Sequence, residues 1–433
     1  MVKYQLAILI SYLFLSVVIA ARLRVCSGNS RKFCYNGKQV YLSGMNQAWK
    51  FYAHDFGNGQ YSSSKVHLES TLKQIHKNGG NSIRIWLHTT SALTPRFNST
   101  GHVVAADHCN NHIIAEMKEY LCAAERYNIV VFFVLWNGAD PNWWRNFQWA
   151  RQFNGLITVD SKLQSYIDNA LIPIVKGLKT FSSLGGYEII NEPEGILFTA
   201  ANSVACFDAS RLAGSGAGFA AQHQFPNLFY MHRLQRFINW QANAIKTHDP
   251  NSLVTVGSWR ENPQYNNGPS NTFNYYSDHC LIQAGGRSLG TLDFYQIHTY
   301  AWNGAYSTTS PMVPTNSASL YQLNKPLVIG EFSHVGSDGT RSLIQLVEHA
   351  YNNGYAGAWS WHALGLYHHS DPLSPQLLAL DAIRWRPFVR LVLGVVNINC
   401  RNPTIGIFDI RRDRFPVQGR PVRNQCSLFT RGR

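Results

Sequence analysis

The stretch GGYEIINEPEG, at residues 185–195, decides how the rest of the chain is interpreted. Its short apolar, β-branched run is typical of a buried strand, and this strand leads directly into Asn191, Glu192 and Pro193. Proline disfavours the helical region for the residue before it, so we expect Glu192 to stay extended, with its carboxylate held up at the end of the strand. A polar site is therefore predicted where this strand ends.

Similar runs recur along the chain and alternate with longer amphipathic segments, which is the pattern of βα units. One such segment, VHLESTLKQIHKNGG, repeats Leu68, Leu72 and Ile75 at helical spacing. Eight strand candidates predict a (β/α)8 TIM barrel of the α/β class, with the active site at its C-terminal rim. An open doubly wound sheet is the alternative, although no glycine-rich phosphate loop follows the first run. The strand candidates are residues 39–44, 81–87, 129–136, 186–190, 252–259, 293–298, 326–332 and 355–361.

A second glutamate ends another buried run, because VIGEF places Glu331 after residues too apolar for a solvated face. Arg84, His298 and Tyr300 also stand at predicted strand ends. Paired carboxylates at one rim suit glycoside hydrolysis, in which one group protonates the departing oxygen and the other attacks or supports the anomeric carbon. An ionised Glu331, held by Arg84 and Tyr300, would raise the proton affinity of Glu192 and leave it able to act as the acid.

The predicted strand ends carry, in chain order, the motifs IRIWL, NEP, IHTY, GEF and WSW. As an ordered set, these motifs resemble glycoside hydrolase family 5. The opening VYLSGMNQAWKFYAHDFGNGQY resembles more narrowly the endo-β-1,4-mannanases of molluscs and other invertebrates, and the likeness runs from about residue 23 to residue 370. NEP alone would be a weak signal, whereas the ordered set is specific.

The resemblance implies a retaining endo-hydrolase with Glu192 as acid/base and Glu331 as nucleophile. It further implies that Asn191 bonds the sugar 2-hydroxyl, that Arg84 and Tyr300 hold Glu331, and that His298 lies near Glu192.

Aromatic residues complete what the resemblance implies. Trp361 would form the floor under the sugar, with Trp359 as the alternative because it shares a strand face with Trp361. Many family members have a histidine after the third strand, but this chain reads LWNGA there, which offers Trp136 or Asn137 instead.

Tryptophans are frequent at or just beyond the predicted strand ends, as in a cleft that stacks on sugar rings. About half of them would be ordinary loop packing, and Trp302 is the strongest candidate for substrate contact. Three histidines, His88, His368 and His369, are expected to be loop polar groups, since no carboxylate or cysteine partners complete a metal set. We expect no metal and no cofactor. The rim tryptophans are Trp49, Trp136, Trp143, Trp144, Trp259 and Trp302.

The N-terminus carries the features of a secretory signal, because Lys3 precedes the apolar run LAILISYLFLSVVIA. We expect residues 1–20 to be a signal peptide, and the mature protein to be extracellular and not bound to a membrane. An uncleaved membrane anchor is the alternative. Eight cysteines suit an oxidising compartment. Cys26 and Cys34 flank a short polar turn, and we expect them to form a disulfide. Simple burial in a helix is the alternative for Cys122. A lone glycosylation sequon occurs at Asn98.

The net charge of +14 is unevenly distributed, because residues 384–433 contain 11 arginines and only two acidic residues. The remainder is nearly balanced and rich in aromatics, which argues against a nucleic-acid partner. We expect a catalytic domain at residues 21–383, followed by a basic C-terminal extension. The extension either adds only charge or adheres to acidic polysaccharide, membrane surface or nucleic acid.

Three functions follow. The leading hypothesis is a monomeric, secreted endo-β-1,4-mannanase that acts on a β-1,4-linked polysaccharide of the mannan type. A β-1,4-glucanase of the same mechanism is its neighbour, since the sequence does not fix how a 2-hydroxyl is discriminated. A catalytically silent sugar-binding barrel is the third, and the presence of both Glu192 and Glu331 argues against it.

Overall fold

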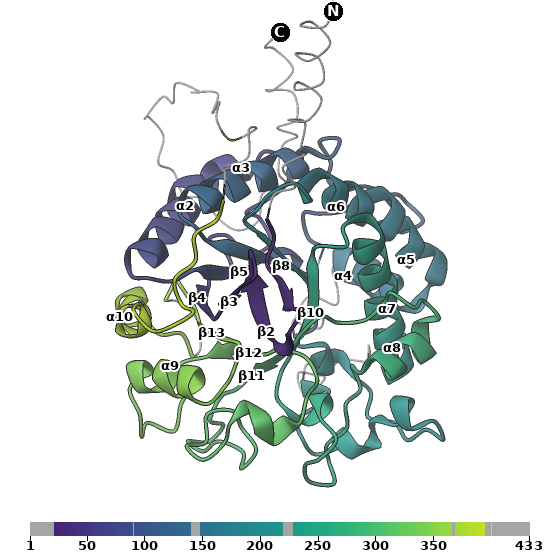
Figure 1. Cartoon of the computed structure of the whole chain (residues 1–433). Coiled ribbons are helices and arrows are strands. Elements are labelled where there is room, and N and C mark those ends of the chain that lie inside the picture. The colour runs from purple at the N-terminus through teal and green to yellow at the C-terminus, as the bar shows by residue number, and fades with distance from the viewer. Residues whose placement is uncertain are drawn as a thin grey trace, which may run out of the picture.

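Eight parallel strands close into a barrel, as the sequence predicts, with helices around it (Figure 1). The computed structural model describes residues 21–89, 91–139, 148–219, 228–365, 369–394 and 400. The predicted signal peptide, most of the basic extension, and Trp143, Trp144 and His368 lie outside these residues. In order around the barrel, the strands are β4 (Leu42–Asn46), β5 (Ser82–Thr89), β8 (Val130–Asn137), β9 (Leu184–Asn191), β10 (Leu253–Ser258), β11 (Tyr295–His298), β12 (Leu327–Phe332) and β13 (Gly357–Ser360).

Helices follow most strands and pack their apolar faces on the barrel. In the helix after β4, Leu68, Leu72 and Ile75 are buried, as their spacing predicts. Between β11 and β12 the described chain forms only a short 3-10 turn, η7 (Ala318–Tyr321). The helices are α2 (Tyr61–Lys77), α3 (His112–Arg126), α4 (Gln148–Thr158), α5 (Asp160–Tyr166), the π-helical turn η1 (Ile167–Leu171), α6 (Ile172–Leu178), α7 (Met231–His248), α8 (Asp278–Gly285), α9 (Leu343–Asn352) and α10 (Leu373–Ile383).

A small antiparallel sheet lies across the centre of the ring of strands in Figure 1. It consists of β1 (Arg24–Cys26), β2 (Asn29–Tyr35) and β3 (Lys38–Val40). The first predicted strand, residues 39–44, is thus divided between β3 of this sheet and β4 of the barrel. The predicted Cys26–Cys34 disulfide joins β1 to β2, with an S–S distance of 2.01 Å.

The N-terminal end of the barrel is filled by apolar side chains from this sheet and the barrel strands. Phe33 is fully buried and meets Phe294 edge to face, with ring centroids 5.3 Å apart. The segment 384–394, the first part of the predicted extension, also packs here. The Asn81 amide donates to the Val389 carbonyl at 2.6 Å, and Leu391 and Leu393 belong to the same cluster.

Two more disulfides between described residues tie distant segments together. Cys122 of α3 is bonded to Cys400, which decides against the alternative that it is simply buried in its helix. A cysteine among apolar residues of a helix is expected both when it is simply buried and when it forms a disulfide. The sequence therefore does not distinguish the two cases for Cys122. Cys206 is bonded to Cys280 and joins the loop after β9 to α8.

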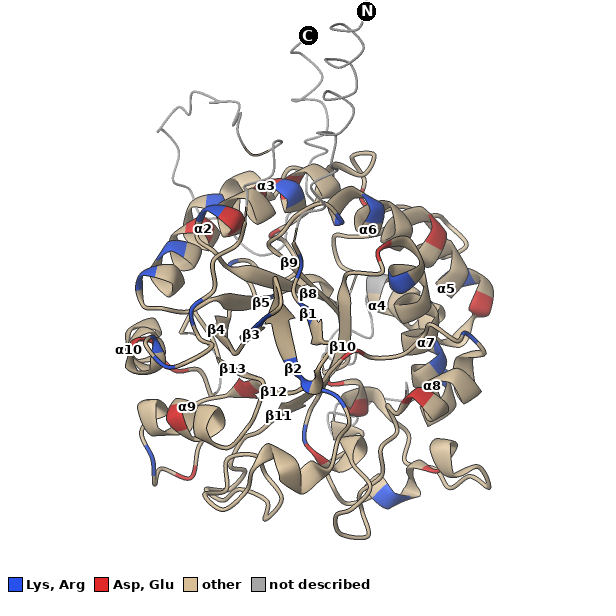
Figure 2. Ribbon diagram, viewed as in Figure 1, with Lys and Arg blue, Asp and Glu red and all other residues tan. Residues whose placement is uncertain are grey.

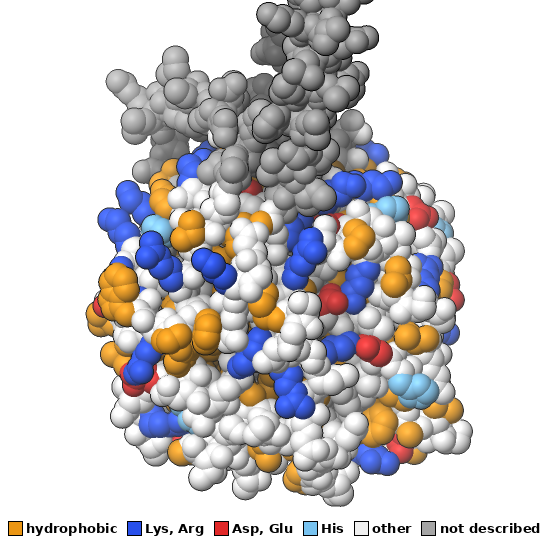
Figure 3. Space-filling model, in the orientation of Figure 1, with side chains coloured by type: hydrophobic (Ala, Val, Ile, Leu, Met, Phe, Trp, Pro, Cys, Tyr) orange, Lys and Arg blue, Asp and Glu red, His pale blue; other side chains and the backbone are white. Residues whose placement is uncertain are grey.

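Surface charges lie mainly on the surrounding helices and loops (Figure 2), and on the face in Figure 3 Lys and Arg side chains are scattered among apolar ones. Asn98 is exposed between β6 (Arg96–Phe97) and β7 (Val103–Ala105), so its sequon is accessible, and its glycosylation remains a prediction. Within the described ranges, no helix combines the length and apolar character needed to cross a bilayer.

Candidate active site

Glu192 follows β9 in a backbone conformation that differs from the predicted one. Its φ of 45° and ψ of 56° are left-handed rather than extended. Pro193 excludes the right-handed helical region, but the chain must turn sharply into the 3-10 turn η2 (Pro193–Ile196), and the left-handed conformation provides that turn. The Glu192 amide donates to the Gly257 carbonyl at 2.6 Å. Such a conformation is uncommon for a residue with a side chain and is often found at functional sites.

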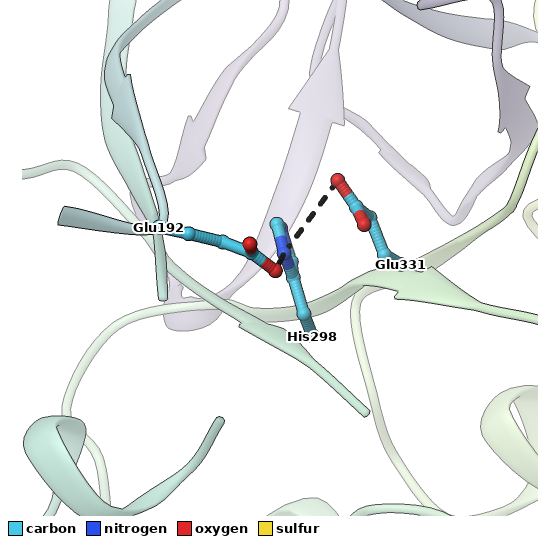
Figure 4. A group of neighbouring side chains, drawn as sticks. All are labelled: Glu192, His298 and Glu331. Atoms are coloured by element: carbon cyan, nitrogen blue, oxygen red, sulfur yellow. Dashed lines mark hydrogen bonds and ion pairs between the residues drawn. The ribbon is translucent and has the colours of Figure 1, made fainter. Parts of the chain in front are cut away.

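The two glutamates predicted as a pair approach each other at the C-terminal rim. Glu331 lies near the end of β12, and His298 ends β11 between them (Figure 4). His298 Nδ1 is 2.9 Å from Glu192 Oε1 and 3.5 Å from Glu331 Oε1. One carboxylate oxygen of each glutamate and a ring nitrogen of His298 lie within 4.8 Å of one another. Retaining glycosidases hold their two carboxyl groups about 5–5.5 Å apart, so this spacing fits a retaining pair.

Arg84 of β5 is fully buried and joins several acceptors beneath the pair. Its Nη1 donates to Glu331 Oε1 at 2.7 Å, and its Nη2 donates to Asn191 Oδ1 at 2.7 Å. Tyr300 donates its hydroxyl to the other oxygen of Glu331 at 3.0 Å. The predicted neighbours of Glu331 are thus brought together.

Glu188 is a member of this network that the sequence interpretation missed. It receives two hydrogen bonds of 2.6 Å from Arg84 and a third of 2.6 Å from Gln296. The sequence did contain a signal for Glu188, because it is a single acidic residue inside the apolar run GYEII, shortly before the polar residues Asn191 and Glu192. A charge in a strand buried on both faces needs a buried partner, and Arg84 was the available one.

The electrostatics distinguish the three central groups. Burial lowers the pKa of His298 to about 4, so its ring is neutral near neutrality. Burial raises the pKa of Glu331, while His298 and Arg84 act in the opposite direction. Burial would lower the pKa of Arg84, but Glu188 and Glu331 outweigh it and the pKa is raised, so the guanidinium stays charged. Burial and the nearby Glu331 raise the pKa of Tyr300 well above its usual value, which keeps its hydroxyl a donor.

Asn191 and Asn137 meet side by side, but Trp136 does not join them. Asn191 Nδ2 donates to Asn137 Oδ1 at 2.9 Å. The prediction that Trp136 supports the substrate site is wrong, because it is fully buried outside the barrel and donates its Nε1 to Gln241 of α7 at 3.0 Å. Its ring packs on Phe153 of α4, with centroids 5.1 Å apart. Although Trp136 stands near the C-terminal end of its strand, apolar packing against the outer helices determines the direction of its side chain.

Trp361 lies at the rim within an aromatic cluster. Its ring centroid is 6.0 Å from that of Trp49 and 5.5 Å from that of Trp86, and Trp361 stays partly exposed. Trp86 was missed as a site residue, although its ring lies 4.2 Å from the Arg84 guanidinium. Trp359, the alternative floor, is fully buried one pleat deeper and donates to Ser82 Oγ at 2.9 Å, so it does not reach the rim.

Trp302 is 55% exposed and stands beside Tyr300, with ring centroids 6.4 Å apart. A small hollow next to Tyr300 is lined in part by Trp259, Glu261 and Trp302. His369 packs its ring against Trp302 at 5.3 Å.

His88 is buried, bonds Thr94 Oγ1 through Nδ1 at 2.8 Å, and packs on Trp136. It lies within strand β5, so the expectation that it is a polar group of a loop is wrong. The apolar stretch before it continues the strand through His88, and the bond to Thr94 satisfies its ring inside the protein.

A cation could in geometric terms be held by Glu192, His298 and Glu331, which form a cluster of suitable donor atoms. However, the Arg84 guanidinium already bonds Glu331 at 2.7 Å, and a second positive charge there would be repelled. The donor set is therefore better suited to proton transfer than to binding a metal ion.

Comparisons with known proteins give the family. The chain is 45% identical over 353 residues to a mannan endo-1,4-beta-mannosidase of Mytilus edulis, covering 81% of this chain and 90% of the relative. It is 38% identical to the enzyme of the same name from Cryptopygus antarcticus, covering 81% and 88%. The crystal structure of the endo-1,4-beta-mannanase of Eisenia fetida is 43% identical, covers 88% of this chain and 100% of that chain, and superposes with a TM-score of 0.78. No family model matches the sequence. On this identity, and with two glutamates close together at the rim of a TIM barrel, the chain belongs to the invertebrate endo-β-1,4-mannanases of glycoside hydrolase family 5.

Proposed function

We propose that this chain is a secreted, monomeric endo-β-1,4-mannanase that hydrolyses internal bonds of mannan-type polysaccharides with retention of configuration. The observation that carries the proposal is the pair Glu192 and Glu331, which bring one carboxylate oxygen each within 4.8 Å of the other at one rim of the barrel. The names of relatives at 45% and 38% identity support mannan as the substrate. Secretion rests on the signal-like N-terminus, which is a sequence argument.

In the first step, an oxygen of Glu331 bonds the anomeric carbon while the bond to the leaving sugar's oxygen breaks. Glu192 gives its proton to that oxygen, so the product leaves as an alcohol. Arg84 and Tyr300 hold the Glu331 carboxylate in place, with donors at 2.7 and 3.0 Å. Glu192 suits the acid role because its side chain is 17% exposed, compared with 6% for Glu331, and it therefore reaches the leaving group and solvent.

In the second step, water attacks the anomeric carbon and the ester bond to Glu331 breaks. Glu192 takes the proton from the water, which restores both groups. Neutral His298, 2.9 Å from Glu192, can remain hydrogen-bonded to it in either protonation state by exchanging donor and acceptor roles.

The sugar at the cleavage point would lie over Trp361, with its 2-hydroxyl near Asn191. Asn191 Oδ1 already accepts from Arg84 and Nδ2 donates to Asn137, so the amide is fixed in orientation. An amide carries two acceptor sites and two donors, which leaves one of each for a hydroxyl. Trp49 and Trp86 brace Trp361 from the side, and Trp302 is placed to contact a sugar farther along the chain.

Product analysis on defined manno- and cello-oligosaccharides tests the substrate assignment. We expect cleavage of internal bonds in the manno series and much slower cleavage in the cello series. The reverse preference would make the protein a β-1,4-glucanase, and binding without release of reducing sugar from either series would make it a silent sugar-binding barrel.

Glu192→Gln tests the assigned acid. The amide cannot protonate a leaving group, so hydrolysis of mannan should fall by about a hundredfold or more. An aryl mannoside with a very good leaving group needs no proton, and its first step should survive as a burst of released phenol. Absence of such a burst would contradict the acid role.

A further inference from the structure

The turn that carries Glu192 contains a buried carboxylate to which neither catalytic step assigns a role. Glu194 is fully buried in η2, two residues after Glu192. Its described hydrogen-bond donors are all neutral: the Ser258 hydroxyl at 2.9 Å, the Trp259 amide at 3.2 Å and the Tyr276 hydroxyl at 2.5 Å. A buried carboxylate bonded only to neutral groups is costly, which indicates that its contacts serve a purpose beyond packing.

The position of Glu194 relative to β10 suggests that purpose. Strands β9 and β10 pair in parallel up to Asn191 and Gly257, and the Glu192 amide adds a last backbone bond to the Gly257 carbonyl. Pro193 has no amide hydrogen, so backbone pairing cannot continue there. Glu194 resumes the connection through its side chain, because its two oxygens bond Ser258 and Trp259, the next two residues along β10 and its loop.

The bonds of Glu194 thus hold the far side of the turn that keeps Glu192 left-handed. Gly257 fixes the turn on one side of Pro193, and Ser258 and Trp259 fix it on the other. The backbone carbonyl of Glu194 also accepts from Gly218 at 2.7 Å, which adds the long loop after β9 to the same anchor. A residue in the left-handed region relaxes readily unless its surroundings restrain it.

We propose that Glu194 is a positioning residue that fixes the carboxyl group of Glu192 for proton transfer. The inference rests on the proposed function, because it assumes that Glu192 is the acid/base. Glu194 is buried beneath the rim and acts entirely through the geometry of the turn. Loss of its bonds should therefore impair steps that need the proton of Glu192 more than steps that do not.

Glu194→Gln tests the inference on two substrates of the wild-type and variant enzymes. An amide in place of the carboxylate keeps the volume but turns one acceptor into a donor, so at least one of the three bonds is lost. We expect kcat/KM on mannotetraose, whose leaving group needs a proton, to fall about tenfold more than kcat/KM on dinitrophenyl β-mannobioside, whose leaving group does not. Azide, which attacks without a general base, should raise kcat on the aryl substrate in the variant.

Two further variants control for folding. Tyr276→Phe removes a single donor to Glu194. It should lower kcat/KM on mannotetraose relative to kcat/KM on the aryl substrate, but by a smaller factor than Glu194→Gln does. Glu125→Gln changes another buried carboxylate that accepts from Ser182 at 2.7 and 2.9 Å at the other end of the barrel, and it should leave the ratio unchanged.

Equal losses on both substrates in Glu194→Gln, without azide rescue, would overturn the inference and leave Glu194 a merely structural loop anchor. A wild-type enzyme that hydrolyses neither substrate would overturn the proposed function and the inference together.

Discussion

The two ends of the barrel are built from the same strands but have opposite chemistry. At the N-terminal end, β1–β3 and the segment 384–394 cover a plug of aromatic and aliphatic side chains such as Phe33 and Trp359. At the C-terminal rim, Arg84, Glu188 and Glu331 are buried together with their charges. Burial of apolar area at the first end stabilises the fold. At the second end, burial of charged groups costs free energy unless the charges are paired and hydrogen-bonded.

This contrast divides stability from chemistry along the length of each strand. Two tryptophans at the end of β13 show this division. Trp359 fills the apolar plug, whereas Trp361, two positions later and just past the strand, faces the site. Substitutions at the two ends should accordingly change different measured quantities. Activity should respond to one end and the free energy of unfolding to the other.

The largest effect is expected for Glu331→Gln at the rim. The amide cannot form the glycosyl ester, so kcat on every substrate, aryl mannosides included, should fall by about a thousandfold or more. The melting temperature should change little, because Arg84 retains its two bonds to Glu188. Steady-state kinetics and calorimetry on one preparation check both parts. Near-full activity would show that the nucleophile is another residue.

Phe33→Ala at the opposite end should do the reverse. Phe33 is fully buried against Phe294, and truncating such a side chain costs about 3–5 kcal/mol of unfolding free energy. At a temperature where the variant remains folded, kcat on mannan should equal that of the wild type. Phe33→Leu is the matched control and should lose much less stability. A large fall in kcat with stability intact would break the division between the two ends.

A smaller effect is expected for Trp302→Ala. The ring is 55% exposed and does not touch the reacting groups in our account, so its loss should raise KM for mannan by about five- to tenfold with kcat nearly unchanged. Trp302→Phe should recover part of the affinity. An unchanged KM would place the sugar chain elsewhere along the rim.

The strands and the glutamate pair could be predicted because the signals are local. Each buried strand is a short apolar run, and a polar residue at its end is conspicuous, as at Glu192 and Glu331. Side-chain direction was harder to predict. Val134 packs with Trp86, and strict alternation would direct Trp136 the same way, yet Trp136 packs among the outer helices. In strands buried on both faces, the pattern of polarity does not mark which face is inside.

Two other features depend on contacts that sequence does not encode locally. The left-handed Glu192 follows from how the chain must turn between Asn137 and Gly257, on neighbouring strands. The Cys122–Cys400 disulfide joins residues 278 positions apart, and a single cysteine within a helix is equally consistent with simple burial. Glu188 was hidden for the opposite reason, because its partner Arg84 was assigned to Glu331 alone.

The stereochemical course of hydrolysis tests the central claim most directly, since it reports how the two glutamates share the reaction. Proton NMR spectra recorded during the first minutes of mannopentaose cleavage resolve the anomeric configuration of the new reducing end before mutarotation. The proposed retaining mechanism predicts that the β-anomer appears first. Initial formation of the α-anomer would mean direct attack by water and would contradict the assignment of Glu331 as a nucleophile.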